Sequence, residues 1–161
     1  MNKLILSVLI FMSFVWGIAA QAKAPKWMDK SRKAVLQITT FDKDNRQIST
    51  GTGFFVSEDG EVLASYSLLK GAAKAQVADV DGKIYPIDRV WGADELYDVI
   101  RMQATIQKKV TFLPLANEPA AVGAPIYLMP FSTDKKPVFK EGQIVEVSKL
   151  SGSYSYYKVS F

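Results

Sequence analysis

Short apolar and β-branched segments alternate with polar turn residues along most of this chain. Ala34–Phe41 is apolar and β-branched, and the polar cluster 42–46 that follows it has turn chemistry. Gln47–Ser57 is the second expected strand, and the turn residues 58–60 lead into a third at Glu61–Ala64. Gly51 and Gly53 in the second strand suit a bulge or a close approach of two backbones. This part of the chain therefore predicts a hairpin followed by a third strand.

The middle of the chain carries the strongest hairpin signal. Gln76–Val80 and Lys83–Ile87 flank Asp81-Gly82, a dipeptide that favours a two-residue turn. Pro86 cannot donate to a ladder, so its strand is expected at an edge or with a bulge. Just before this hairpin, Ser67–Ala73 has the shape of one helical turn that a glycine stops.

The remaining segments continue the same pattern. Val90–Tyr97 is expected as a loop and Val99–Thr105 as a strand, and prolines punctuate the connecting region after it. Three further strands are expected at Ala124–Pro130, Gly142–Leu150 and Tyr156–Phe161. Short strands joined by hairpin turns favour a barrel or a sandwich over βαβ units, so the predicted fold class is all-β.

The N-terminus has the pattern of a secretory signal peptide. Lys3 precedes the apolar run Leu4–Ala20, which leads to the small-residue site Ala20-Gln21-Ala22. Cleavage after Ala22 predicts a secreted or periplasmic protein that is free of the membrane, and an uncleaved anchor is the alternative reading. Residues 1–22 are thus assigned to the signal peptide and 23–33 to a polar lead-in segment that suits a short helix.

Charge and composition narrow the classes of function. The chain carries a net charge of +4, and loss of residues 1–22 removes only Lys3 among the charged side chains. Its basic clusters at 23–33 and 135–140 are interleaved with Asp29 and Asp134 and carry no nucleic-acid motif, so a solvated face is expected and no nucleic-acid partner. The absence of cysteine and histidine excludes disulfides, thiol chemistry and zinc sites built on those residues, and no cofactor or metal is expected.

An ordered set of weak motifs over residues 34–161 resembles the trypsin-like (chymotrypsin-fold) serine peptidases, and among them the bacterial HtrA-type branch. The motifs are Thr50–Val56 with Glu58-Asp59-Gly60, Leu63–Leu69 with Gly71-Ala72, Asp81-Gly82-Lys83, Asp94–Met102, Leu113-Pro114-Leu115, Val122-Gly123 and Gly142–Val145. The resemblance implies a double β-barrel. Its first barrel fits residues 34–105, whereas 106–161 supply a connector and only about three strands of an incomplete second barrel.

The catalytic triad of that family is not intact in this sequence. By the resemblance, Ser67 occupies the position of the family histidine, Asp98 fits the position of the aspartate, and no glycine-flanked nucleophilic serine occurs before Phe161. A serine hydroxyl needs a neighbouring base to act as a nucleophile, and the chain contains no histidine. Asp98 therefore lacks an imidazole to orient, and we expect it to be a loop carboxylate that accepts backbone hydrogen bonds at a strand start.

Other possible arrangements of catalytic groups have less support in the sequence. Ser67 and Lys70 spell the S-x-x-K motif of penicillin-binding enzymes, but the companion motifs S-D-N and K-T-G are absent. An N-cap serine followed by a surface lysine is the expected interpretation. Paired acids, such as Asp79 with Asp81 or Glu58 with Asp59, are expected as turn residues, and the tyrosines at 154, 156 and 157 as strand packing.

The sequence leaves three interpretations of function open. The first is a non-catalytic module that binds a protein or peptide ligand, and the second is a serine endopeptidase with an unrecognised base. The third is the N-terminal part of a longer multidomain protein. A double barrel needs about 200 residues or more, so a C-terminal segment or a partner chain is expected to complete the second barrel.

Overall fold

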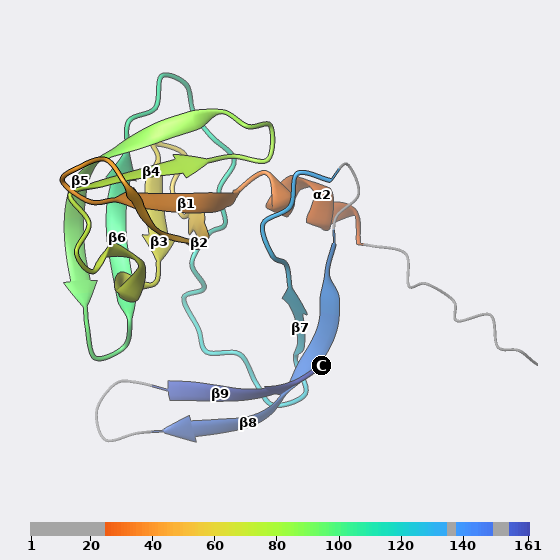
Figure 1. Ribbon diagram of the computed structural model, residues 1–161. Helices are drawn as coiled ribbons and strands as arrows, with labels where there is room; N and C mark the ends of the chain where they lie inside the picture. Colours follow the sequence, from red (N-terminus) through yellow and green to blue (C-terminus); the bar gives the residue numbers. More distant parts are fainter. Residues whose placement is uncertain (1–24, 135–137, 150–154) are drawn as a thin grey trace, which may run out of the picture.

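The computed structural model describes residues 25–134, 138–149 and 155–161, so the expected signal peptide lies outside the described residues. Within these ranges the chain forms one α-helix, one 3-10 helix and nine strands, which are labelled in Figure 1. Their bounds are α2 (Lys26–Arg32), β1 (Val35–Phe41), β2 (Gln47–Phe55), β3 (Glu61–Ala64), η1 (Tyr66–Leu69), β4 (Lys74–Ala78), β5 (Ile84–Asp94), β6 (Val99–Ala104), β7 (Pro125–Leu128), β8 (Lys140–Lys149) and β9 (Ser155–Ser160).

The strands form two separate sheets. The first six close into a barrel in the order β1-β2-β3-β6-β5-β4, and β7, β8 and β9 form a three-stranded sheet in chain order. All neighbouring strands in the two sheets pair antiparallel. Figure 1 shows the barrel on one side and the smaller sheet on the other, linked by the long connector after β6. The expected fold, all-β with a complete first barrel and a partial second one, is confirmed.

The hydrophobic core lies inside the six-stranded barrel. Alternate residues of a strand point to opposite faces, so in β6 Ile100, Met102 and Ala104 are buried while Arg101 faces solvent. The buried cluster consists of Leu36, Ile38, Phe55, Val62, Val77, Tyr85, Ile100, Met102 and Ala104. Burial of these side chains removes their apolar surface from water, which is the main favourable term that holds the barrel closed.

Both glycines of β2 lie where another chain segment comes close. A Cβ atom on Gly53 would lie 2.6 Å from Ile38 Cδ1 and 2.8 Å from the Leu63 carbonyl oxygen. A Cβ atom on Gly51 would lie 2.5 Å from Leu68 Cδ1. The close approach expected from the sequence is therefore present, and at Gly51 it allows η1 to pack directly on the barrel wall.

Aspartates hold the two marked hairpin turns. Asp42 Oδ1 accepts the backbone N–H groups of residues 44 and 46, at 2.8 and 2.9 Å. Asp79 Oδ1 does the same for residues 81 and 83, at 3.0 and 2.9 Å. Gly82 adopts φ +79, a conformation that glycine tolerates and other residues seldom do. The predicted β4–β5 hairpin is confirmed, but its turn is longer than the two residues expected, because β4 ends at Ala78 and β5 begins at Ile84.

The expectation of a loop over residues 90–97 is wrong for 90–94, because β5 continues to Asp94, and it is correct for 95–97, which lie in the turn before β6. Two register shifts interrupt its pairing with β6, one between Ile87 and Arg89 and one between Val90 and Gly92. Each bulge inserts an extra residue and breaks the period-two pattern, so the segment does not read as a strand. Pro86 lies in the interior of β5, which pairs with β4 on one side and β6 on the other. The bulges expected for its strand are present, and β5 pairs with β4 up to Pro86 and with β6 alone from Ile87 onward.

Helix α2 lies between the barrel and the three-stranded sheet. Its Met28 is fully buried, and its Trp27 ring meets the ring of Tyr127 in β7 edge to face, with centroids 5.0 Å apart. Arg32 Nη1 donates to the carbonyl oxygen of Asp134 at 2.7 Å. The short lead-in helix expected from the sequence is thus present, and it joins the two sheets. Neither helix in the described ranges has the length and hydropathy needed to span a bilayer.

Candidate functional site

Ser67 lies in η1, the single 3-10 turn that follows β3. Ser65 is the N-cap of this turn, so the interpretation of Ser67 itself as the N-cap is wrong. The turn is anchored to the barrel by Thr40, whose buried hydroxyl donates to the Leu68 carbonyl oxygen at 3.0 Å. Gly71 follows with φ +76, which matches the expected glycine stop. The backbone around Ser67 is therefore fixed from both ends.

Asp98 lies one residue before β6 and faces this turn. Its Oδ1 accepts the backbone N–H of Ser67 at 2.6 Å, and its Oδ2 accepts the Ser67 hydroxyl at 3.1 Å. Its own carbonyl oxygen accepts the N–H of Tyr66 at 3.2 Å. The structure thus brings the two sequence-predicted site residues together. The expectation that Asp98 accepts a backbone hydrogen bond is confirmed. Its carboxylate nevertheless has a side-chain partner, because Ser67 donates to both of its oxygens.

The hydrogen bonds at Asp98 determine its charge state. The backbone N–H of Ser67, and then the side chains of Ser67 and Ser65, lower the pKa of the Asp98 carboxyl below its ordinary value. Desolvation opposes this effect only in part, since the side chain is exposed. A carboxylate with a lowered pKa holds its negative charge and is a weak proton acceptor near neutral pH. Asp98 is therefore poorly suited to deprotonate the Ser67 hydroxyl.

Lys70 does not supply the missing base. Its Nζ lies 2.9 Å from Glu95 Oε1. The hydrogen bond to Glu95, and then the negative charge of Glu95, raise the pKa of the Lys70 ammonium. A nucleophilic or basic lysine needs the opposite shift, which burial or a neighbouring cation produces. Lys70 is accordingly a charged surface residue, as expected, and the S-x-x-K interpretation finds no support in the geometry.

The site is open to solvent beside the second sheet. Ser67 and Asp98 are both exposed, and the ring of Tyr97 lies 6.2 Å from that of Tyr156 in β9. This ring contact brings the second sheet next to the turn between β5 and β6. The Ser67–Asp98 pair therefore lies near the junction between the barrel and the three-stranded sheet.

The other acidic pairs are structural. Asp79 Oδ2 accepts the Tyr85 hydroxyl at 2.9 Å, and Glu58 forms an ion pair with Lys109. The backbone N–H of Asp59 donates to the Ser57 hydroxyl at 3.0 Å. Within the described ranges, no group of three or more acids lies close enough to hold a metal ion.

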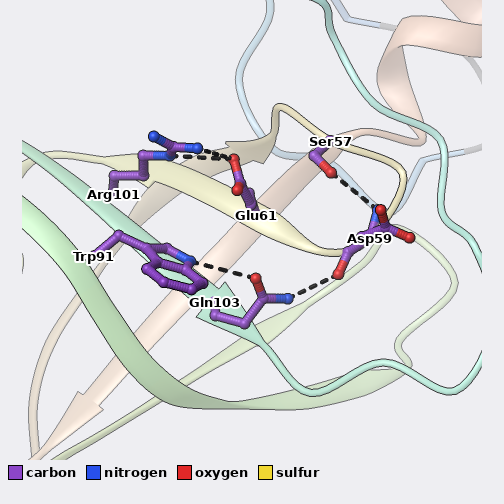
Figure 2. A network of polar contacts seen from close by, with 6 residues as sticks. All are labelled: Ser57, Asp59, Glu61, Trp91, Arg101 and Gln103. Carbon is purple, nitrogen blue, oxygen red and sulfur yellow. Dashed lines mark hydrogen bonds and ion pairs between the residues drawn. The ribbon is translucent and has the colours of Figure 1, made fainter.

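One polar network on the outside of the barrel is absent from the sequence-based candidates. Trp91 Nε1 donates to Gln103 Oε1 at 3.3 Å, and Gln103 Nε2 donates to the Asp59 carbonyl oxygen at 2.7 Å (Figure 2). Beside it, Arg101 Nη2 lies 2.6 Å from Glu61 Oε2. The sequence hides this network because its residues come from three strands and the turn before β3, and because Trp91 lies in the segment expected as a loop.

Comparison with known proteins agrees with the fold. The profile of the trypsin-like peptidase domain matches residues 51–160. Over 121 residues the chain is 24% identical to the anti-sigma-I factor RsgI9 of Acetivibrio thermocellus, an alignment of 75% of this chain and 15% of that protein. Over 74 residues it is 39% identical to HhoB of Synechocystis, which is named as a putative serine protease, an alignment of 46% of this chain and 17% of HhoB.

The chain therefore aligns with less than a fifth of the length of either relative. The profile match is more extensive in relation to this chain, since it covers more than half of the 161 residues and includes strands of both sheets. By this match, the chain belongs to the family of trypsin-like peptidase domains.

Proposed function

We propose that this protein is an exported, non-catalytic trypsin-like domain that binds a protein or peptide ligand. The observation that carries the proposal is the Ser67–Asp98 pair. The two oxygens of the Asp98 carboxylate are occupied by the backbone and hydroxyl of Ser67, at the place where the family resemblance puts an imidazole. A fold can persist after its chemistry is lost, so retention of the barrel around this pair favours a binding role.

The charge states around the pair support the same proposal. Asp98 holds its charge because its pKa is lowered, and Lys70 holds its charge because its pKa is raised. The sequence contains no histidine that could act as the base instead. One of the two relatives is named as an anti-sigma-I factor, which is compatible with use of this domain outside proteolysis, whereas the other is named as a putative serine protease.

Absence of hydrolysis is the first test. Incubation with casein and with a fluorophosphonate probe should leave both unchanged, and Ser67→Ala should behave like the parent protein. Ser67→His should not restore cleavage, because an imidazole alone supplies no nucleophile. Labelling of a single serine that is lost in Lys70→Ala would contradict the proposal and would support a serine endopeptidase with a lysine base.

Binding without cleavage is the second test. Unfolded casein labelled with a fluorophore should raise its anisotropy when the protein is added, while electrophoresis shows the casein intact. Casein that is neither bound nor cut would contradict a peptide-binding role. Casein that is bound and cut would favour the endopeptidase alternative.

Export is a separate part of the proposal. The charged start, the apolar run and the small-residue site support cleavage after Ala22. Mass spectrometry of periplasmic material should give an N-terminus within one or two residues of Lys23. An intact Met1 in that material would contradict the proposal and would favour an uncleaved anchor.

We also propose that the three-stranded sheet is completed by a further chain segment or by a partner chain. Tyr157, Val159 and Phe161 are each at least 40% exposed, and exposed apolar strands are templates for pairing. For residues 23–161, size measurement together with amide exchange tests this idea. A monomer with strong protection through β8 and β9 would contradict it.

A further inference from the structure

The wall of the barrel is unpaired along part of one strand. Pairing between β4 and β5 covers Gln76–Ala78 and Ile84–Pro86 and then ends. Beyond Pro86, β5 pairs only with β6, from Ile87 to Asp94. The residues from Asp88 to Ala93 are all exposed. Backbone N–H and C=O groups along such an edge are available to another strand.

A groove runs beside this free edge. A cavity of about 470 Å³ lies between the start of β4, the β1–β2 turn and β5, and it continues into a second one of about 190 Å³. Ala73 and Lys74 line both cavities, Phe41 lines the first, and Asp88 and Arg89 line the second. The larger volume is in the range of ligand sites, and the small alanine side chains on one wall leave this space open.

The charges at the groove favour an acidic ligand. Lys74 Nζ is hydrogen-bonded to the neutral Asn45 Oδ1 at 2.6 Å, and Arg89 lies over the Trp91 ring, 4.8 Å from its centroid. Among the described residues, neither cation takes part in an ion pair. Asp88 is the acidic residue in the lining, so the groove carries a net positive charge.

The opposite border of β5 is held in place. Trp91 is fixed by its hydrogen bond to Gln103, and Gln103 is fixed by the Asp59 carbonyl oxygen (Figure 2). On the neighbouring strands, Arg101 is paired with Glu61. A strand that is ordered before binding loses less conformational entropy when a ligand pairs with it. The free edge is therefore ordered before binding, and its two bulges, at Asp88 and at Trp91, leave Arg89 and Val90 as the regular pair between them.

We propose that the Ile87–Val90 edge of β5 binds an extended acidic peptide by strand addition. The backbone of the peptide pairs with β5, an apolar side chain enters the groove beside Phe41, and a carboxylate lies between Lys74 and Arg89. Strand addition of this kind takes its affinity from main-chain hydrogen bonds and its specificity from side-chain pockets. The inference rests on the proposed binding function and assigns its location.

The test uses the purified chain and a fluorescent peptide of seven residues that alternates threonine with valine and carries a central aspartate. Ala73→Trp fills the groove, and Arg89→Glu reverses one charge; each should weaken binding at least about tenfold, the loss expected when a central contact is removed. Ala121→Trp and Lys26→Glu make the same changes at exposed positions outside the groove and should leave binding unchanged. Amide exchange should slow between Ile87 and Asp94 when the peptide binds.

The outcomes separate this inference from the proposed function. If neither groove variant weakens binding of the peptide, and if amide protection appears elsewhere in the chain, the β5 site is overturned. The proposed peptide-binding function would still stand. Absence of binding by this peptide at millimolar concentration, while unfolded casein still binds, would also overturn the site alone. A dimer that Ala73→Trp dissociates would show that a second copy of the chain occupies the edge, which again overturns it.

Discussion

Asp98 adopts a backbone conformation that few residues other than glycine adopt. Its φ of +53 lies in the left-handed region, which aspartate and asparagine tolerate better than most residues. This conformation coincides with the position at which its carboxylate meets Ser67 and its carbonyl oxygen meets Tyr66. A side chain suited to this local geometry thus organises the whole η1 turn, with no catalytic task required.

The pH dependence of the Ser67 amide tests this role of Asp98. Because the pKa of the folded carboxyl is lowered, its contribution to stability is present above the unfolded value of about 4 and is lost as the pH falls through the folded value. The Ser67 amide resonance should therefore shift on acidification. Asp98→Asn keeps the tolerated backbone conformation and should abolish the shift. The same titration in the variant would contradict the assignment.

Tyr85 gives a second pH-dependent prediction at the alkaline end. Burial, then its hydrogen bond to Asp79, raises the pKa of the Tyr85 hydroxyl to about 12. Since the unfolded value is about 10, the stability that this group contributes is present below pH 10 and is lost as the pH rises toward 12.

Tyr85→Phe is the variant that measures this contribution. It should lower the free energy of unfolding by about 1 kcal/mol at pH 8, the usual net value of one hydrogen bond, and by less at pH 11. Denaturant titrations at the two pH values measure the difference. A loss that grows with pH would contradict the assignment.

At the scale of single elements, the packing of β2 requires a residue without a side chain at Gly53. Gly53→Ala should destabilise the barrel by about 1–3 kcal/mol, because the added methyl would meet the Leu63 carbonyl oxygen and Ile38. Gly92→Ala is the matched control, since its Cβ would meet nothing within 4 Å. We expect that control to be neutral or stabilising by about 0.5–1 kcal/mol. Equal losses in the two variants, measured by thermal unfolding, would contradict the packing argument.

Strand β5 shows where periodicity fails to predict a strand. The hairpin turn predicts a strand at Lys83–Ile87, and the structure confirms it from Ile84 onward. The continuation to Asp94 does not follow from the sequence, since the bulges near Asp88 and Trp91 place exposed residues in succession. Bulges arise from pairing with another strand, so a local pattern of apolar and polar residues does not reveal them.

At the scale of the whole molecule, α2 couples the two sheets in addition to the contact between Tyr97 and Tyr156. Met28→Ala should lower the free energy of unfolding by about 2–5 kcal/mol, because it removes a fully buried side chain and leaves a cavity. Lys26→Ala, at an exposed position of the same helix, should change it by less than about 0.5 kcal/mol. Denaturant unfolding measures both variants. An equally small loss in both variants would show that Met28 of α2 does not contribute to the core.

Trp27 tests the coupling itself. Trp27→Ala removes the edge-to-face contact with Tyr127, and we expect faster amide exchange in β7 and β8 with little change in β1–β6. Trp27→Phe retains an aromatic ring and should keep most of the protection. Uniform acceleration in both sheets would mean that they unfold as one unit.

Turn chemistry and strand composition by themselves determine the fold class of this protein. The Asp-Gly turn, the β-branched strands and the glycines of the second strand are local signals, and a chain of such signals favours a barrel or a sandwich over βαβ units. The absence of histidine, likewise, is a property of the sequence alone.

Only the tertiary structure decided how distant residues meet. It paired Ser67 with Asp98 across 31 positions, it set Arg101 against Glu61 across 40, and it left the outer edge of β5 open beside Lys74. Contacts of this kind depend on strand register and on where a ladder ends, and both are set by the packing of the whole barrel. No segment of the sequence contains that information by itself, because each partner of such a contact lies on a different strand or turn.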